Sequence, residues 1–384
     1  MNAIITAYKN LDKGKEKIAM KRFIAMLLAV VMCIGLFAGC GSKTEEKPAA
    51  EAGNAAAAPA EKAEVGGGES SLKGKRVRVV IGSTSTGGDS YMIADMVTRY
   101  LSEEMGFNGK VDAVGNAAAL DAITKADGDG TTIMMFHDMA YLSVLFGAVG
   151  EEYALENLTV GPQIGSNPGG CFGSNAATPY NSLVEAAEWL VANPDETVSI
   201  NIEAGSASHL CFGVFYMWAK ETYGEDVASR IKAIVGGTTD EKKQRLWDGN
   251  ADIIYADVSS LVEYTKEGVD AQLATKIFDT CGVVEGYSSM ADAGMTFNGE
   301  VFSFNKDFFM YFPKDMDEGI LAEINEAMMK VAANPEFQAE MANLKYTAVS
   351  PENTDMAVSR EYINSKRDAA VAIVEQCPSL DELT

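Results

Sequence analysis

Strand-like and helix-like stretches alternate along this chain from about residue 75 to its end, and this order constrains the fold most strongly. The strand-like stretches are short apolar runs, and the helix-like stretches carry apolar residues three or four positions apart. Regular alternation predicts parallel sheets with helices on both faces. The strand-like stretches are 77–81, 132–136, 198–202, 231–235 and 251–256, and the helix-like ones are 93–101, 211–218, a helix beginning at 238, 261–266 and 320–331.

The length of the alternating part predicts more than one sheet. The chain has 384 residues, and domains of about 150 residues are common. We therefore expect an α/β protein with two lobes, each built on its own sheet. In sheets of this kind, ligands bind beyond the carboxyl ends of the strands, where the N-termini of the following helices point.

The N-terminal part of the sequence resembles an export signal. A basic segment, Met20-Lys21-Arg22, precedes an apolar run at 23–37, which is short for a membrane span of about 20 residues. The small residues before Cys40 resemble a bacterial lipobox, although Phe37 stands where leucine is more common. We expect a lipoprotein signal peptide over 1–39, translation starting at Met20, and lipidation of Cys40. An uncleaved anchor helix is the alternative, and both place the rest of the chain outside the cytoplasmic membrane.

The segment that follows Cys40 is predicted to be a tether. Residues 41–70 are rich in Ala, Glu, Gly and Pro and contain almost no large apolar side chains. Such a composition offers too little apolar surface to offset the entropy lost on ordering. We therefore expect a flexible tether over 40–74 that joins the lipid anchor to the folded part.

Charge and residue composition exclude several classes of function. The formal net charge of -24 opposes binding to nucleic acid, and no nucleotide-binding fingerprint is present, so we expect no cofactor. Two histidines without clustered cysteines predict no metal site. Outside the signal and lipid-site cysteines, the sequence allows three disulfide pairings or free buried thiols for the remaining four: Cys171, Cys211, Cys281 and Cys377.

The first candidate binding loop joins the strand at 77–81 to the helix at 93–101. Glycines let the backbone approach a ligand closely, and Asp89 is a candidate N-cap for the helix. Hydroxyls and amides at the positive end of a helix would form an anion site. A purely structural turn is the alternative. The candidate residues are Ser85, Thr86, Gly87, Gly88 and Asp89.

The second candidate loop also joins a strand to a helix. It contains Gly205, Ser206, Ser208 and His209, and the histidine lies in the first helical turn, where the helix dipole favours its neutral form. The serine and histidine raise the alternative of a secreted serine hydrolase using Ser206 and His209. The nucleophile-elbow pattern Gly-x-Ser-x-Gly is absent, so we expect binding without catalysis.

Two further residues follow strands and are weaker candidates. Thr238, with Glu241, forms a capping-box pattern. Asp257 is a candidate ligand acceptor or a cap for the next helix. Because the two glycine loops contain no Lys or Arg, we expect backbone amides and hydroxyls to hold an anion there.

The order of these motifs resembles the extracytoplasmic solute receptors of tripartite tricarboxylate transporters, from Lys75 to the end. Gly205-Ser206-Ala207-Ser208-His209 is similar to the family's Gly-Ser-x-x-His motif. The first loop lacks the family's proline and has a shorter Gly-to-Asp spacing, which leaves the ligand open. The other matching segments are Gly87-Gly88-Asp89, Asp129-Gly130-Thr131-Thr132-Ile133, Gly236-Gly237-Thr238, Asp248-Gly249-Asn250-Ala251-Asp252 and Met290-Ala291-Asp292-Ala293-Gly294.

The resemblance implies a two-lobed periplasmic-binding-protein-like fold of type II, hinged by crossing strands. It implies a first lobe at 75–178 plus 300–384 and a second at 179–299, with the two glycine loops clamping a small carboxylate. It also implies integral membrane transporter subunits as partners of a monomeric, lipid-anchored receptor. An ABC-type receptor and a sensory receptor are the alternatives.

Overall fold

The computed structural model describes residues 69–384. The predicted signal peptide, the start at Met20, the lipidation of Cys40 and the tether as far as residue 68 lie outside the described residues. Between residues 69 and 384, every helix is too short or too polar to cross a membrane.

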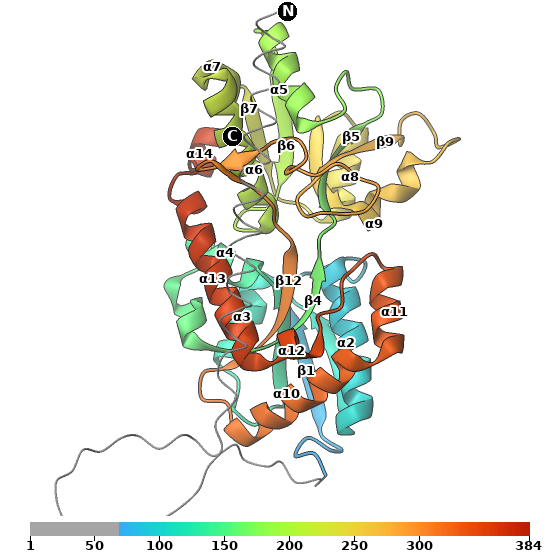
Figure 1. The fold of residues 1–384 in the computed structure, drawn as a ribbon, viewed down its shortest axis with the longest axis vertical. Helices are drawn as coiled ribbons and strands as arrows, with labels where there is room; N and C mark the ends of the chain where they lie inside the picture. Colours follow the sequence, from blue (N-terminus) through green and yellow to red (C-terminus); the bar gives the residue numbers. More distant parts are fainter. Residues whose placement is uncertain (1–68) are drawn as a thin grey trace, which may run out of the picture. The chain divides into compact units, whose positions relative to one another are not determined.

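The first sheet has five strands in the order β2-β1-β3-β12-β4 (Figure 1). β1 runs parallel to β2 and β3, whereas β12 runs antiparallel to both of its neighbours. The strands are β1 (Arg76–Ile81), β2 (Asn108–Ala113), β3 (Thr132–His137), β4 (Leu158–Asn167) and β12 (Lys306–Pro313).

The second sheet also has five strands, in the order β7-β6-β8-β5-β9. β6 runs parallel to β7 and β8, and β5 runs antiparallel to β8 and β9. The expectation of purely parallel sheets was therefore wrong. The chain passes from β4 directly into β5, and a strand reached without a helical crossover need not run parallel to its neighbours. The strands are β5 (Gly170–Asn175), β6 (Val198–Ile202), β7 (Ile231–Val235), β8 (Ile253–Asp257) and β9 (Thr275–Thr280).

Helices cover both faces of the first sheet. The side chains of β12 show this arrangement, because they point alternately toward the helices on one face and on the other. Because successive side chains point to opposite faces, Phe308 and Met310 pack in one apolar cluster and Phe309 and Tyr311 in another. The first cluster holds residues of α2 (Asp89–Met105), α10 (Glu318–Ala333) and α11 (Pro335–Asn343), and the second holds residues of α3 (Asn116–Thr124), α4 (Met139–Leu145) and α13 (Met356–Val374).

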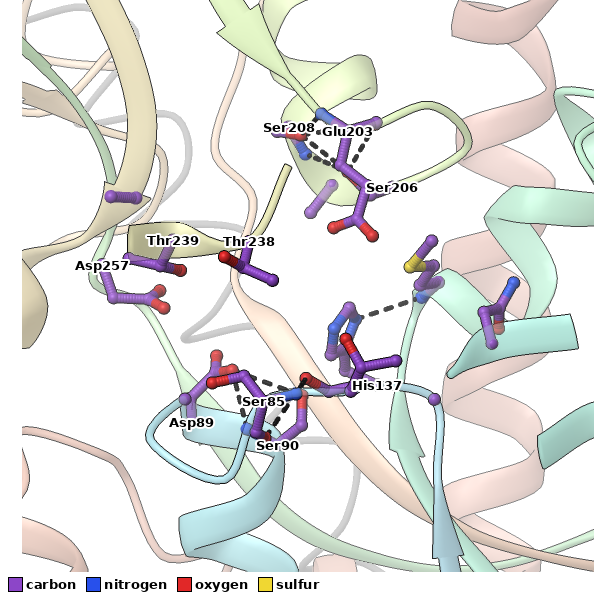
Figure 2. Close-up of a pocket in the computed structure, with 18 of the residues that line it drawn as sticks. Ser85, Asp89, Ser90, His137, Glu203, Ser206, Ser208, Thr238, Thr239 and Asp257 are labelled. Atoms are coloured by element: carbon purple, nitrogen blue, oxygen red, sulfur yellow. Dashed lines mark hydrogen bonds between the residues drawn. The ribbon is translucent and has the colours of Figure 1, made fainter. Parts of the chain in front are cut away.

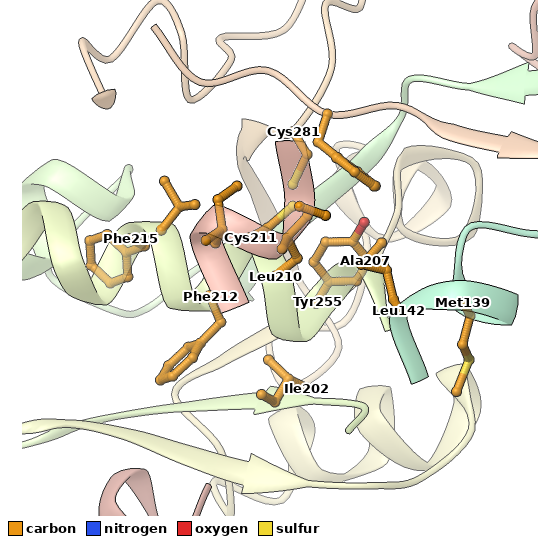
Figure 3. Packing of buried hydrophobic residues seen from close by; sticks show 14 of the residues in the cluster. Met139, Leu142, Ile202, Ala207, Leu210, Cys211, Phe212, Phe215, Tyr255 and Cys281 are labelled. Atoms are coloured by element: carbon orange, nitrogen blue, oxygen red, sulfur yellow. The ribbon is translucent and has the colours of Figure 1, made fainter. Parts of the chain in front are cut away.

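The core of the second lobe is built around α6. Its residues Leu210, Cys211 and Phe215 are fully buried together with Cys281, and Tyr255 of β8 packs in the same cluster (Figure 3). The four cysteines of the described part are free thiols, three of them buried. The helices of this lobe are α5 (Leu183–Ala192), α6 (Ala207–Tyr223), α7 (Glu225–Ala228), α8 (Thr239–Trp247) and α9 (Val258–Leu261).

Short elements complete the fold. They are the 3₁₀ helices Glu151–Tyr153, Leu155–Asn157 and Val262–Thr265, the hairpin strands β10 (Thr296–Phe297) and β11 (Glu300–Val301), and the helices α12 (Pro351–Thr354) and α14 (Leu380–Leu383). The last of the 3₁₀ helices follows α9, and these two short elements replace the single helix that was expected at 261–266.

The chain enters the second sheet earlier than the expected boundary at 179 and returns to the first sheet later than the expected boundary at 300. It leaves the first sheet after Asn167, enters the second at Gly170, and returns to the first at Lys306. β5 therefore belongs to the second sheet, although 170–178 were expected in the first lobe. At the C-terminus, α13 contacts α6 and α14 contacts β7, so the end of the chain also packs on the second lobe.

Residues 70–74, which were expected in the tether, belong to the folded first lobe. Leu72 is fully buried in the core of the first lobe. Ser70 and Ser71 donate hydrogen bonds to the carboxylate of Glu323 in α10. One buried apolar side chain and three hydrogen bonds thus hold this segment on the first lobe despite its polar composition.

Candidate functional site

A cavity of about 440 Å³ lies between the two lobes and takes its lining from both of them (Figure 2). The first lobe contributes the loop before α2 and the ends of β2 and β3. The second contributes the carboxyl ends of β6, β7 and β8 and the helix starts that follow them. The lining includes Ser83, Ser85, Gly88, Asp89, Ser90, Asn116, His137, Glu203, Ser206, Ser208, Thr238, Glu241, Lys242, Tyr255, Asp257 and Lys306.

The loop before α2 is folded by its own hydroxyls. Ser83 Oγ accepts from the Ser85 amide at 3.1 Å, and Ser85 Oγ accepts from the Gly87 amide at 3.2 Å. The N-cap position is Gly88, and the cap is not made by a side chain. The expectation that Asp89 is the N-cap residue of α2 was therefore wrong. Asp89 is the first helical residue, where its Oδ1 accepts from the Ser90 amide at 2.7 Å and its Oδ2 accepts from a lysine of the crossing strand β12.

That lysine, Lys306, joins the two lobes at the base of the cavity. Its ammonium group donates to Asp89 of the first lobe and, at 2.5 Å, to Asp257 of the second. Asn167, paired with Lys306 in the sheet register, donates to the same two carboxylates, each at 3.0 Å. The three ionic side chains are 7–13% exposed, so this is a buried ion-pair network.

The two carboxylates of the network are electrostatically different. Burial opposes ionisation of Asp89, but the attraction of Lys306 and the hydrogen bonds from Lys306 and Asn167 together outweigh burial and hold the pKa of Asp89 well below its usual value. Burial, followed by repulsion from Asp89, raises the pKa of Asp257. Burial also opposes protonation of Lys306, but the two carboxylates raise its pKa. The network therefore keeps one firmly ionised carboxylate and one that is easier to protonate.

The loop before α6 brings a well-formed helix N-terminus to the same cavity. Ser206 is the N-cap residue, and its Oγ accepts from the Ser208 amide at 3.1 Å and donates to the Glu203 carbonyl at 2.8 Å. Gly205 has a φ of 69°, and an added Cβ would lie 2.9 Å from Ser143 of the first lobe. Glycine is therefore required there both by conformation and by the close approach of the two lobes.

His209 lies behind this loop rather than in the cavity lining. Its Nδ1 accepts from the Gly205 amide at 3.3 Å, and its ring stacks on Phe146 of the first lobe with centroids 3.8 Å apart. Burial lowers its pKa to about 4, so the ring is neutral. Ser206 and His209 do not form the serine–histidine hydrogen bond that an activated nucleophile uses.

The third helix N-terminus at the cavity belongs to α8. The predicted capping box is confirmed, with Thr238 and Glu241 each accepting from the other's backbone amide. One residue further on, Lys242 is buried and donates to the Tyr255 carbonyl at 3.3 Å. Burial lowers its pKa.

His137, at the carboxyl end of β3, is a cavity residue that the sequence analysis missed. It is 8% exposed, and its Nδ1 accepts from the Met139 amide at 3.2 Å. Burial lowers its pKa to about 3, so the ring is neutral and its proton is on Nε2. Within the described chain Nε2 has no hydrogen-bond partner, and the ring extends into the cavity (Figure 2).

The structure brings together most, but not all, of the predicted site residues. Thr86, Gly87, Gly205 and His209 are outside the cavity lining. The missed residues are those that the two loops alone could not reveal, above all His137, Glu203, Lys242 and Lys306. The predicted residues that line the cavity are Ser85, Gly88, Asp89, Ser206, Ser208, Thr238 and Asp257.

The cavity offers polar contacts for a small ligand. Three helix N-termini, several hydroxyls and the Nε2–H of His137 supply donors, and Glu203 supplies an acceptor. The expectation that only backbone amides and hydroxyls surround the anion was incomplete, since the basic side chains of Lys242 and Lys306 also line the cavity. They come from α8 and β12, outside the two glycine loops.

Comparison with known proteins relates the chain to solved structures alone. No protein-family model and no curated protein sequence matches it. MatC from Rhodopseudomonas palustris, solved with bound malate, aligns with a TM-score of 0.64 at 16% identity, over 78% of this chain and 99% of that one. A second R. palustris protein, solved with adipate, aligns with a TM-score of 0.60 at 14% identity, over 78% and 97%.

A TctC solute-binding protein from Polaromonas aligns with a TM-score of 0.54 at 12% identity, over 78% of this chain and 98% of that one. The resemblance found in the sequence is thus confirmed at the level of the fold. The chain has the two-lobed fold of periplasmic solute-binding proteins, in which each lobe is a sheet flanked by helices and crossing strands join the two.

Proposed function

We propose that this protein is a solute-binding receptor that captures a small carboxylate outside the cytoplasmic membrane and does no chemistry on it. The observation that carries the proposal is the cavity of about 440 Å³, lined by helix N-termini from both lobes. Helix N-termini favour anions because their backbone N–H groups point outward and their dipoles are positive there. A ligand held by both lobes would favour their closed arrangement.

The donors at hand are sufficient for useful affinity. A micromolar dissociation constant corresponds to about 8 kcal/mol. Hydrogen bonds to a charged group contribute about 1.5–3 kcal/mol each, and helix ends add up to about 2 kcal/mol when partly buried. Four or five such contacts, drawn from His137, the loop hydroxyls and the helix amides, offset the cost of binding.

The finer part of the proposal concerns the partners. We propose that Cys40 carries a lipid anchor and that the closed receptor, as a monomer, delivers its ligand to integral membrane subunits of a tripartite tricarboxylate-type transporter. The lipobox-like sequence before Cys40 supports the anchor. The order of sequence motifs and the fold shared with the TctC protein support the transporter type.

A binding screen tests the proposal. The purified chain is unfolded thermally in the presence of mono-, di- and tricarboxylates and of amino acids, and positive ligands are titrated calorimetrically. A ligand at 100 times its dissociation constant stabilises the folded state by about 2.7 kcal/mol. If no carboxylate-bearing compound, amino acids included, raises the unfolding temperature, the proposal is wrong.

A further inference from the structure

The charges that line the cavity do not suit a simple dianion. Four carboxylates face two ammonium groups there: Asp89, Glu203, Glu241 and Asp257 against Lys242 and Lys306. His137 adds no charge, because burial keeps its ring neutral at physiological pH. The lining therefore has an excess of two negative charges, and a ligand with two carboxylates would add two more.

Both lysines are already engaged by the protein. Lys306 donates to Asp89 and Asp257, so its single positive charge is already outnumbered by the two carboxylates that it contacts. Lys242 donates to the Tyr255 carbonyl, and the attraction of Glu203 is the largest charge effect that opposes the lowering of its pKa by burial. A second ligand carboxylate would thus lie near Glu203 without a free cation to neutralise it.

Glu203 is held in place by its backbone while its side chain is free. Its amide donates to Ser208 Oγ at 2.8 Å, and its carbonyl accepts from Ser206 Oγ at 2.8 Å. Its carboxylate makes no hydrogen bond or ion pair with another residue in 69–384. Figure 2 shows this side chain extending from the end of β6 into the space between the lobes. Glu203 therefore presents an unpaired carboxylate to the cavity from a backbone that is held in place.

A donor faces the same space from the other lobe. The Nε2–H of His137 is unpartnered in the described chain and belongs to a side chain that is 8% exposed. Unlike the Nε2 of His209, this atom is not fully buried, so it is open to the cavity and can donate to an acceptor on a ligand. The first lobe thus presents a donor for a carboxylate, and the second presents an acceptor for a cation.

We infer that the ligand is a small zwitterion, an amino acid or a close analogue, whose ammonium group is bound by Glu203 and whose carboxylate is bound by His137 and the helix N-termini. The inference rests on the proposed function, because it names the ligand class of the same cavity. A zwitterion places its positive charge beside the unpaired carboxylate and adds no net charge to an acidic cavity.

Matched ligand pairs test the inference. Calorimetry compares each amino acid with the acid that lacks its amine: L-aspartate with succinate, L-glutamate with glutarate, and so on through the natural set. At least one amino acid should bind tenfold or more tightly than its partner acid. Glu203→Gln should weaken binding of that amino acid about ten- to hundredfold and leave the partner acid unchanged or improved. Glu221→Gln, an exposed glutamate of α6 outside the cavity, is the matched control and should change neither.

The outcomes separate the two claims. If acids without an amine bind as tightly as their amino counterparts, or if Glu203→Gln leaves amino acid affinity unchanged, the zwitterion inference is wrong and the carboxylate receptor stands. If neither amino acids nor simple acids bind, the proposed function itself is wrong.

Discussion

Two buried networks in this protein have the same composition and differ in what they leave unsatisfied. Each contains one lysine and two aspartates: Lys306 with Asp89 and Asp257, and Lys366 with Asp138 and Asp307. They are adjacent in the sequence at Lys306 and Asp307, the first two residues of β12. Because successive strand residues point to opposite faces, one network lies at the ligand cavity and the other beneath α13.

The network beneath α13 is fully satisfied. The three ammonium protons of Lys366 have three acceptors: Asp138, Asp307 and the Asn305 carbonyl, at 2.6–2.9 Å. Both aspartates accept further hydrogen bonds, among them those donated by Tyr141 and Tyr362, each at 2.8 Å. Lys366 also borders an apolar cavity of about 640 Å³, but its ammonium group has no proton left for a ligand.

The network at the cavity is incomplete. Lys306 donates to two acceptors, and Asp257 uses only Oδ1 in hydrogen bonds within the described residues. The unused positions border the cavity, where water or a ligand can reach them. Burial and composition do not distinguish the two networks. What marks the binding site is that the network at the cavity has a donor and an acceptor without a partner in the described part of the chain.

The largest predicted effect tests this difference by removing each lysine. Lys366→Met should lower the free energy of unfolding by about 3–5 kcal/mol, because two buried carboxylates lose their cation. Lys306→Met should cost less, because water in the cavity can solvate Asp89 and Asp257, yet it should weaken ligand binding more than Lys366→Met. Urea unfolding without ligand and calorimetric titration measure the two quantities.

An exposed lysine is the control for both variants. The side chain of Lys330 is 55% exposed and pairs with Glu104 and Glu326, so Lys330→Met should cost under about 1 kcal/mol. If Lys306→Met destabilises as much as Lys366→Met and leaves binding intact, the two networks are equivalent and the comparison fails.

The next prediction concerns the pH dependence that two buried histidines give to stability, one beside the cavity network and one outside the cavity lining. The folded protein keeps His137 and His209 neutral, with pKa values of about 3 and about 4, against 6.5 when unfolded. Between pH 7 and 5 the unfolded chain binds protons that the folded chain does not, so stability falls as pH falls. Each histidine should contribute a loss of about 2 kcal/mol over that range.

The contribution of His137 is measured as a difference. The raised pKa of Asp257 acts in the opposite sense, so urea unfolding of the unmodified protein and of His137→Gln is compared at pH 7 and pH 5. The variant should lose about 2 kcal/mol less stability than the unmodified protein. His209→Gln, at a site outside the cavity lining, should show the same reduction without a loss of ligand affinity. Parallel pH profiles for His137→Gln and the unmodified protein would contradict the assignment.

Much of the fold follows from local sequence patterns, because local physics determines it. Apolar alternation predicted β6, and the threonine–glutamate spacing predicted the capping box of α8, which the structure confirms. The strands β5 and β12 were not predicted, because both are buried along nearly their whole length and so lack the alternation that marks a half-buried strand. The anchoring of Leu72 was also hidden, since one apolar residue in a polar segment is a weak signal.

The cavity was only partly predictable for the same reason. The loops before α2 and α6 could be predicted from their glycine and serine residues. Lys306 could not, because in the sequence it is only a polar residue at the end of an apolar strand. Its carboxylate partners lie 217 and 49 positions away in the sequence. Glu203 and His137 are single polar residues at strand ends. The one available signal was their position, since carboxyl strand ends surround ligand sites in such sheets.

The smallest predicted effect on stability concerns two helix caps, one at the cavity and one away from it. Ser206 caps α6 at the cavity, and Ser182 caps α5, accepting from the Glu185 amide at 3.0 Å outside the cavity lining. Alanine at either position removes one cap and should cost about 1 kcal/mol in urea unfolding. Only Ser206→Ala should also weaken ligand binding, because its hydroxyl fixes the loop that holds Glu203. Equal stability losses with equal, unchanged affinities would mean that the cap at the cavity is as purely structural as the one on α5.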